Sequence, residues 1–385
     1  MADISYLDWP FLEVRHGELS NRIEHWCDDH LIDAHPSDVD AECRKLVRDL
    51  GAAGYLKLCI AEGDKAPDVR SLAIARETLA RHSGLADFTF AMQGLGSGAI
   101  SLAGSPEQRA LWLPKVASGE AIAAFAMTEP AAGSDAANLA MTARKDGDEF
   151  ILGGEKTYIS NGGIADFYTV LARTGEGESA RGLSMFIVPA DTPGLTIAER
   201  IQVIAPHPLA RLNFDGVRGE LIGAPGEGFR IAMQTLNLFR VTVGAAALGF
   251  ARRALDEAIA FASTRRLGEG TLADNAVTQA NLAEMALAID ASALLIYRAA
   301  WQQDMHQGDN RRAAAMAKLH ATESAQRVID MAVQLHGGLG VTRGVPVEAL
   351  YRDIRALRIY EGASEVQRQI IARDLLKEAP KDIRA

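Results

Sequence analysis

The segment Arg358-Ile359-Tyr360-Glu361-Gly362-Ala363-Ser364-Glu365-Val366-Gln367-Arg368 places a carboxylate beside an aromatic ring and a glycine near the end of a long chain. It follows the basic, helix-like run Tyr351-Arg352-Asp353-Ile354-Arg355. A lone glutamate is usually a solvated surface group. A functional role for Glu361 is favoured because two further segments occur earlier in the chain, Met127-Thr128-Glu129-Pro130-Ala131-Ala132-Gly133-Ser134-Asp135 and Gln334-Leu335-His336-Gly337-Gly338-Leu339-Gly340.

Together, and in this order, the three segments resemble the acyl-CoA dehydrogenase family, and the likeness extends over nearly the whole chain. The resemblance implies a fold that is mainly α with a central β domain. We therefore expect an N-terminal helical domain (residues 1–120), a small barrel-like or sandwich-like β domain (residues 121–225) and a C-terminal four-helix bundle (residues 226–385).

Hydrophobic periodicity and proline content support this division. Leu19, Ile23 and Trp26 share one helical face near the start of the chain. Six of the thirteen prolines fall between Pro130 and Pro225, where β-type runs occur at residues 150–152, 167–171 and 185–188. Beyond residue 226 the chain is Ala-rich, with helical spacing and no proline until residue 346. Three glycines in residues 90–98 predict an interruption of the N-terminal helices, with a helix-helix crossing as the alternative.

The bulk composition excludes several classes of protein. A chain of 385 residues that is 48% hydrophobic is globular, and its net charge of -10 without a basic block argues against nucleic acid as a partner. Cys27, Cys43 and Cys59 form no C-x-x-C pair, which favours a reducing compartment. The acidic N-terminus shows no leader, and no apolar run looks long enough to cross a bilayer. We expect a cytoplasmic protein without membrane partners.

The first cluster of histidines is a poor candidate for a metal site. This cluster comprises His25, Cys27, Asp29, His30 and His35. Only His25 and Asp29 have the i, i+4 spacing that places two ligands on one helical face, and no further ligand completes a set nearby. A solvated helix face is the better interpretation, so no metal is predicted.

The reaction implied by the resemblance removes two hydrogens from a saturated acyl-CoA thioester, the α-hydrogen as a proton and the β-hydrogen as a hydride to FAD. Glu361 aligns with the base of the family. Some relatives carry the base instead on a bundle helix, at the position that is Phe239 here, and a phenylalanine cannot take a proton. The resemblance also implies that the N–H of Glu361 grips the thioester oxygen, together with a flavin hydroxyl.

The flavin site implied by the resemblance combines several segments. The first lies in the predicted β domain and contributes Phe125, Met127, Thr128, Gly133 and Ser134. The second contributes Tyr158, Ile159 and Ser160. The remaining contacts are expected from Arg265, Gln334, Gly337, Gly338, Ala363 and Glu365. As isolated patterns, Thr-Glu-Pro also suits a helix start and Gly-Gly a helix C-cap.

The sequence departs from the family pattern on the adenine side of FAD. Gly268 and Glu269 replace an aromatic residue and a glycine, and Asn275 and Ala276 replace an aromatic residue or histidine followed by glutamine. Ala363 stands where a threonine is common. If two hydrogen bonds are lost, FAD binding weakens by roughly 1–3 kcal/mol.

Substrate contacts are expected in the glycine-rich stretch, at the first flavin segment, on the first predicted helix of the C-terminal bundle and beside Glu361. Arg240 lies on an apolar helical stripe, where it needs an anionic partner, either an acid on a neighbouring helix or the substrate. The full expected set is Met92, Leu95, Ser134, Phe229, Asn237, Phe239, Arg240 and Gly362. The bulk of Leu238 and Phe239 favours a short, branched or cyclic acyl group.

The family resemblance further implies an electron-transferring flavoprotein as the electron acceptor, and a homodimer or homotetramer in which one subunit reaches the FAD of another. Three alternatives stay open. They are an acyl-carrier-protein dehydrogenase or flavin oxidase on the same scaffold, a nucleic-acid-associated flavin-binding homologue, and a non-redox homologue.

Overall fold

The computed structural model describes residues 3–31, 38–63, 65–147, 149–305 and 309–378, so His35 of the N-terminal histidine cluster lies outside the described residues. The chain divides into two compact units. Unit 1 comprises Met1–His35, Asp68–Asp87 and Arg240–Ala385, and unit 2 comprises Pro36–Pro67 and Phe88–Phe239. The boundaries of the three domains expected from the sequence stay predictions.

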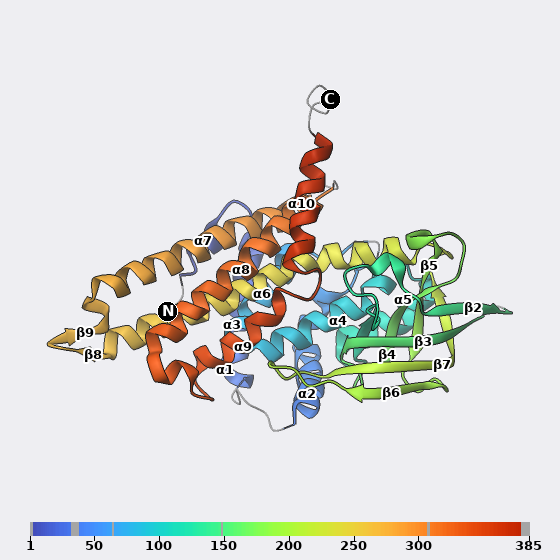
Figure 1. The fold of residues 1–385 in the computed structure, drawn as a ribbon, viewed down its shortest axis with the longest axis horizontal. Helices are drawn as coiled ribbons and strands as arrows, with labels where there is room; N and C mark the ends of the chain where they lie inside the picture. The colour runs from blue at the N-terminus through green and yellow to red at the C-terminus, as the bar shows by residue number, and fades with distance from the viewer. Residues whose placement is uncertain (1–2, 32–37, 64, 148, 306–308, 379–385) are drawn as a thin grey trace. The chain divides into compact units, whose positions relative to one another are not determined.

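Unit 2 contains the predicted sheet and the helices that cover it (Figure 1). Its helical elements are α2 (Val39–Ala52), η2 (Tyr55–Cys59), most of α4 (Gly84–Ala103), α5 (Pro106–Ser118), η3 (Ala136–Asn138), η4 (Ser179–Gly182) and the start of α6 (Gly228–Thr264). Its strands are β1 (Ala123–Ala126), β2 (Thr142–Asp146), β3 (Glu149–Ser160), β4 (Phe167–Arg173), β5 (Leu183–Pro189), β6 (Leu195–Arg200) and β7 (Leu209–Ile222).

The strands of unit 2 form a sheet whose pairings close on themselves. The order is β1-β4-β2-β3-β7-β5, and β5 pairs back onto β4 with Phe167 opposite Pro189 and Arg173 opposite Leu183. Strand β6 adds to β7. This closure agrees with the barrel-like form expected from the sequence, and the three β-type runs lie in β3, β4 and β5.

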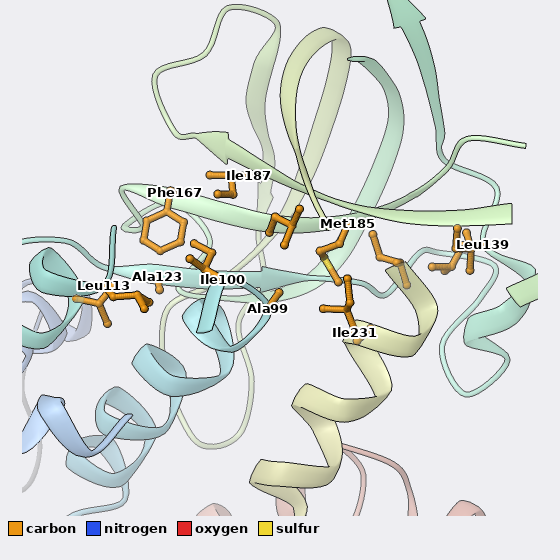
Figure 2. Close-up of a cluster of buried hydrophobic side chains, with 14 of the residues drawn as sticks. Ala99, Ile100, Leu113, Ala123, Leu139, Phe167, Met185, Ile187 and Ile231 are labelled. Carbon is orange, nitrogen blue, oxygen red and sulfur yellow. The ribbon is translucent and has the colours of Figure 1, made fainter. Parts of the chain in front are cut away.

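A hydrophobic core lies between the sheet and the helices of unit 2. Figure 2 shows Phe167, Met185 and Ile187 of the strands packing with Ile100 of α4 and Ile231 of α6. These side chains are almost fully removed from water. Burial of this kind stabilises a fold by about 25 cal/mol per Å² of apolar surface, so this cluster fixes the helices against the sheet.

The glycine-rich stretch does not interrupt its helix, which corrects that expectation. Helix α4 runs without a break from Gly84 to Ala103. A Cβ added at Gly94 would lie 2.5 Å from the ring of Phe239, and one at Gly96 would lie 2.6 Å from the backbone of Ala124. The glycines therefore permit close approach of α4 to α6 and β1, and this packing overrides their weak helix propensity.

Unit 1 is a set of packed helices (Figure 1). The elements of unit 1 are η1 (Ser5–Asp8), α1 (Val14–His30), α3 (Val69–His82), the remainder of α6, the hairpin β8 (Arg266–Leu267) and β9 (Gly270–Thr271), η5 (Leu272–Asp274), α7 (Ala276–Met305), α8 (Arg311–His336), η6 (Gly337–Val341), α9 (Pro346–Leu357) and α10 (Ser364–Glu378). Helix α8 packs against α7, α9 and α10, while α3 packs against α1 and α7. The prediction of a mainly α fold with a central β region is confirmed.

Two helices qualify as membrane spans by length and composition alone, contrary to the expectation from the sequence. The apolar windows of α6 and α7 have mean hydropathies of 1.3 and 1.4. The α6 window is 83% buried within the structure, as in the core helix of a globular protein, whereas the α7 window is only 33% buried. Helix α7 therefore carries an exposed apolar face.

Candidate active site

The predicted base lies in a tight turn between α9 and α10. Glu361 and Gly362 both have left-handed backbone conformations, with φ of 52° and 93°. A non-glycine residue rarely adopts this conformation and usually needs its surroundings to hold it there. The N–H of Ser364 donates to the carbonyl of Arg358 at 3.1 Å, which closes the turn across Glu361.

The carboxyl group of Glu361 is secluded. The residue as a whole is half-buried, but Oε2 is inaccessible to solvent and has no hydrogen-bond partner among the described residues. Burial raises the pKa of this carboxyl, while the charges of Arg76, Lys318 and Arg240 act in the opposite direction. A secluded carboxylate with a raised pKa suits a general base.

Three cations of unit 1 act on this carboxyl, each from a different helix. Arg76 of α3 is buried and binds Asp87 through two hydrogen bonds of 2.7 and 2.8 Å. Lys318 of α8 donates to the carbonyl of Gly362 at 2.8 Å. Arg240 of α6 is buried, and its Nη2 would lie 3.8 Å from a Cβ added at Gly362.

The structure thus gathers Glu361, Gly362 and Arg240 in one cluster, as the sequence suggested. Desolvation lowers the pKa of Arg240, and Glu361 is the acid that opposes this shift. Glu361, an acid of the chain itself, is therefore one anionic partner of Arg240. A role for Arg240 in substrate binding stays a prediction.

In unit 2, hydrogen bonds from β3 hold the first predicted flavin segment in place. Lys156 of β3 is fully buried and donates to the carbonyl of Met127 at 2.9 Å and to Oε1 of Glu129 at 2.8 Å. The N–H of Thr157 donates to the carbonyl of Thr128 at 2.9 Å. These bonds tie residues 127–129 to β3 and leave the side chains of Met127 and Thr128 partly exposed.

The second predicted flavin segment lies at a bulge in β3. The pairing register of β3 and β7 shifts between Lys156 and Ile159. Tyr158, within this shift, has a φ of 54° and is 62% exposed, which is unusual for a large aromatic residue. Ile159 is buried and Ser160 is partly exposed. The bulge presents an aromatic ring and a hydroxyl at the surface of unit 2.

The hydroxyl groups of these two segments can donate hydrogen bonds to the polar edge of a flavin. Thr128 and Ser160 offer partly exposed hydroxyls, and Ser134 is exposed beside Gly133. Phe125 and Phe229 are only partly buried and pack against the core cluster of Figure 2. Met92, Leu95 and Phe239, predicted to line the acyl site, are buried in unit 2, and Asn237 is partly exposed.

The departures from the family pattern on the adenine side coincide with local structural features. Gly268, with a φ of 61°, and Glu269 form the turn of the β8–β9 hairpin. Oδ1 of Asn275 accepts hydrogen bonds from the N–H groups of Val277 at 2.9 Å and Thr278 at 3.3 Å, so Asn275 caps the start of α7. These positions shape turns and helix ends in this chain.

The other predicted contacts for the FAD tail lie in unit 1. Arg265, Gln334, Gly338 and Glu365 are exposed, and Ala363 is partly exposed. The N–H of Gly337 donates to the carbonyl of Gln334, so Gly337 is the C-cap of α8, as the alternative interpretation of Gly-Gly held. Its φ is 60°, and a Cβ added there would meet nothing within 4 Å.

Sequence reasoning missed Arg76, Lys318 and the pair of Glu129 and Lys156. The signal was present for Lys318, because it lies on a stripe with Ala314, Ala321 and Ala325. All four side chains are buried. A lysine on such a stripe calls for a partner by the argument used for Arg240.

Three family models match this chain. They are the acyl-CoA dehydrogenase N-terminal domain over residues 15–120, the middle domain over residues 124–217 and the C-terminal domain over residues 226–376.

Curated relatives cover most of the chain. The short-chain specific acyl-CoA dehydrogenase of Homo sapiens mitochondria is 38% identical over 86% of this chain and 82% of its own length. The cyclohexane-1-carbonyl-CoA dehydrogenase of Geobacter metallireducens is 34% identical over 89% of this chain and 91% of its own length.

Solved structures share the fold along nearly the entire chain. A chain from a structure described as the electron transferring flavoprotein of Acidaminococcus fermentans matches with a TM-score of 0.89 and 32% identity, over 95% of this chain and 99% of that one. A glutaryl-CoA dehydrogenase of Mycobacterium smegmatis in complex with FADH2 matches with a TM-score of 0.87 and 27% identity, over 96% and 97% of the two chains.

Proposed function

Since this chain belongs to the acyl-CoA dehydrogenase family, we propose that it removes the α-proton of an acyl-CoA thioester with Glu361 and so introduces an α,β double bond. As a family member it is an FAD-dependent oxidoreductase that acts on acyl-CoA. FAD, when bound, accepts the β-hydrogen as a hydride. The roles of individual residues are proposals from the geometry.

The observation that carries the proposal is the seclusion of Glu361. Oε2 is shielded from water and has no hydrogen-bond partner in the described parts of the chain, so it is free to accept a proton. Burial raises the pKa of the carboxyl toward the range useful for a base, and the cations Arg76, Lys318 and Arg240 stabilise its ionised form.

An α-proton becomes acidic enough to remove only when the thioester oxygen is stabilised. The backbone N–H of Glu361 is our candidate donor to that oxygen, because its left-handed turn is held by Gly362 and Ser364. A main-chain donor beside the base would stabilise the developing negative charge while the carboxylate takes the proton. Arg240 is our candidate for binding the thioester arm.

FAD would be held by two sets of residues. The flavin ring would contact the Met127–Ser134 loop and the Tyr158–Ser160 bulge, whose exposed aromatic ring and hydroxyls support this proposal. The tail would contact Arg265, Gln334, Gly337, Gly338, Ala363 and Glu365. Because Asn275 and Gly268 serve a helix cap and a hairpin turn, we propose that FAD is held more weakly than in typical relatives. Extended dialysis followed by measurement of bound flavin tests this, and full retention would contradict it.

The acyl group is proposed to be short, branched or cyclic. Phe239 supports this because its ring is wedged against α4 at Gly94 and cannot easily move aside. Similar proteins include one named for short-chain acyl-CoA and one for cyclohexane-1-carbonyl-CoA.

We propose an electron-transferring flavoprotein as electron acceptor, which agrees with the description of one structural relative. Self-association into a dimer or tetramer is supported by the exposed apolar face of α7, where Val277, Leu287 and Leu294 are 67%, 65% and 45% exposed. A cytoplasmic location is proposed because all three cysteines are free and buried, which suits a reducing compartment.

The experiment that tests the function is an anaerobic titration of the purified flavoprotein with a panel of thioesters. We expect short, branched or cyclic acyl-CoA to bleach the oxidised flavin, and an electron-transferring flavoprotein to restore its colour faster than oxygen does. Bleaching by acyl carrier protein thioesters alone would assign a carrier-protein dehydrogenase, and rapid recovery in oxygen would assign an oxidase. No bleaching by any thioester would refute dehydrogenation.

A further inference from the structure

The turn that carries Glu361 depends on one carbonyl group, that of Gly362. This oxygen accepts two side-chain hydrogen bonds, from Nζ of Lys318 at 2.8 Å and from Nε2 of Gln367 at 2.7 Å. A Cβ added at Gly362 would lie 2.5 Å from the same Nε2, so a glycine is required for the amide to come this close. Two donors on one carbonyl hold a backbone conformation that a glutamate seldom adopts.

The rest of the turn is tied to α8 as well. Oγ of Ser364 donates to Oε1 of Glu323 at 2.6 Å, and Nη2 of Arg358 lies 2.8 Å from Oε2 of the same carboxylate. Lys318 and Glu323 are both residues of α8. Helix α8 therefore contacts the turn on both sides of Glu361, at Arg358 before it and at Gly362 and Ser364 after it.

A lysine is a costly choice for this position. The side chain of Lys318 is fully buried, and burial lowers its pKa to about 8 despite the opposing effect of Glu361. A neutral donor would satisfy a carbonyl at less cost, as Gln367 does in the same turn. An ammonium group here therefore points to a use for its charge.

The charge of Lys318 acts within a defined set of ionisable groups. The negative charges of Glu361, Glu323 on α8 and Glu365 on α10 raise the pKa of Lys318. The positive charge of Arg240 on α6 lowers it. Glu361 in turn is influenced by Arg76 of α3 and Asp87 of α4. The charges of Arg76 and Asp87 largely offset each other because the two are paired, so Lys318 and Arg240 supply the net positive charge.

We propose that Lys318 is a positioning residue for the base: its ammonium fixes the Gly362 carbonyl, and thereby the turn that aims the Glu361 carboxylate, and its charge keeps that carboxylate ionised. This inference rests on the proposed role of Glu361 as the base. It assigns two separable effects to one side chain, a geometric effect through the hydrogen bond and an electrostatic effect through the charge.

The experiment compares Lys318→Met, Lys318→Gln and Gln367→Leu in the full-length flavoprotein. Methionine keeps the shape of lysine and removes charge and donor, glutamine removes the charge but keeps a donor, and Gln367→Leu removes only a neutral donor. Two quantities are measured against pH: the rate of anaerobic flavin reduction by acyl-CoA, and the infrared band of the protonated Glu361 carboxyl, assigned by its loss in Glu361→Gln. Near-ultraviolet circular dichroism checks that each variant is folded.

In Lys318→Met we expect the infrared midpoint of Glu361 to rise by roughly one pH unit and the reduction rate at neutral pH to fall by about 10-fold or more. Raising the pH should restore part of this rate. Lys318→Gln should show the same rise in midpoint with a smaller loss of rate at high pH. Gln367→Leu should lower the rate at every pH without moving the midpoint.

Three results would overturn the proposal. They are an unchanged midpoint in both folded lysine variants, a reduction rate in Lys318→Met within about twofold of the wild type, which is too small for a lost positioning contact, and a midpoint in Gln367→Leu that moves as far as in Lys318→Met. Failure of the proposed function looks different: Glu361→Gln would then reduce its flavin normally, while the infrared midpoint would still depend on Lys318.

Discussion

Oε1 of Glu129 lies 2.8 Å from Nζ of Lys156, and both side chains are buried beneath the loop proposed to hold the flavin ring. The carboxylate of Glu129 also accepts hydrogen bonds from the N–H groups of Ala140 at 2.6 Å and Met141 at 3.0 Å. Lys156 reaches the carbonyl of Met127 as well. One buried ion pair thus connects the loop, β3 and the segment before β2.

Glu129→Gln should loosen this loop. The substitution leaves the Lys156 ammonium buried without a counter-charge, and breaking a buried pair in this way costs on the order of 3–5 kcal/mol. We expect a lower melting temperature and less flavin per protein. Glu155→Gln, on β3 beside Lys156, is the control. Glu155 is exposed, and its surface ion pair with Arg211, at 3.6 Å, contributes little to stability. Equal flavin content in both variants would argue against the clamp.

Glu361→Gln should bind FAD and acyl-CoA but lose flavin reduction by several orders of magnitude, because the amide cannot take the α-proton. Rapid-mixing absorbance without oxygen measures this rate. Asp374→Asn is the matched control, since it removes a carboxylate from α10 that pairs with Arg312 at 3.4 Å and has no assigned role in catalysis. Near-normal reduction by Glu361→Gln would refute the assignment.

Phe239→Ala should widen the range of acyl chains. The ring fills the space beside Gly94, so its removal leaves a cavity that a longer acyl group can occupy, at a stability cost of about 3–5 kcal/mol. We expect kcat/KM for longer thioesters to rise relative to short ones, by roughly tenfold or more per filled methylene. Leu236→Ala removes a buried side chain from the same helix and should leave the preference unchanged. An unaltered chain-length profile in Phe239→Ala would contradict the proposed channel.

Asp353 should make stability depend on pH. Burial raises the pKa of this carboxyl to about 7, above the ordinary aspartate value. The folded state therefore holds its proton more tightly than the unfolded state, so its contribution is full below about pH 4 and is lost as the pH rises to about 7. Asp353→Asn, which stays neutral, should be more stable than the wild type at pH 8 by on the order of 2–4 kcal/mol. Denaturant unfolding at pH 4 and pH 8 measures this, and an equal difference at both values would contradict it.

Helix α7 should mediate self-association. Leu287 and Leu294 lie seven residues apart on one exposed face, and burying them in a second copy of the chain would stabilise the assembly by roughly 25 cal/mol per Å². Replacing both by glutamate should lower the mass measured by sedimentation. Val14→Glu, at an 81% exposed position on α1, serves as the control. An unchanged mass in the double variant would place the interface elsewhere.

The sequence identified Glu361 as the candidate base, because it stands in a motif whose neighbours can be compared directly with those of the family. It also predicted the β runs, since short runs rich in apolar and aromatic residues, separated by turn clusters, are typical of strands. Residues 90–98 show the limit of this reasoning. Glycine spacing predicted an interruption, but contacts with Phe239 and Ala124 from distant segments made a continuous helix the stable outcome.

The polar partners of the site could not be predicted in the same way. Lys318 and Gly362 are 44 residues apart, and Lys156 and Glu129 are 27 residues apart, so no local spacing connects either pair. The alanine stripe around Lys318 indicates a buried lysine, but it does not identify the group that the lysine contacts. Only the packing of α8 against α10, and of β3 beside the Met127–Glu129 loop, decides which groups these charges meet.

The sequence by itself determined that a β region lies between two helical regions, which carboxylate is available as a base and the family to which the chain belongs, because these follow from residue identity and short-range spacing. The tertiary structure decided which charges surround that carboxylate, how far its pKa moves and what holds its turn in place. The physical reason is that desolvation and Coulomb interactions depend on distances between segments far apart in the chain, and only folding sets those distances.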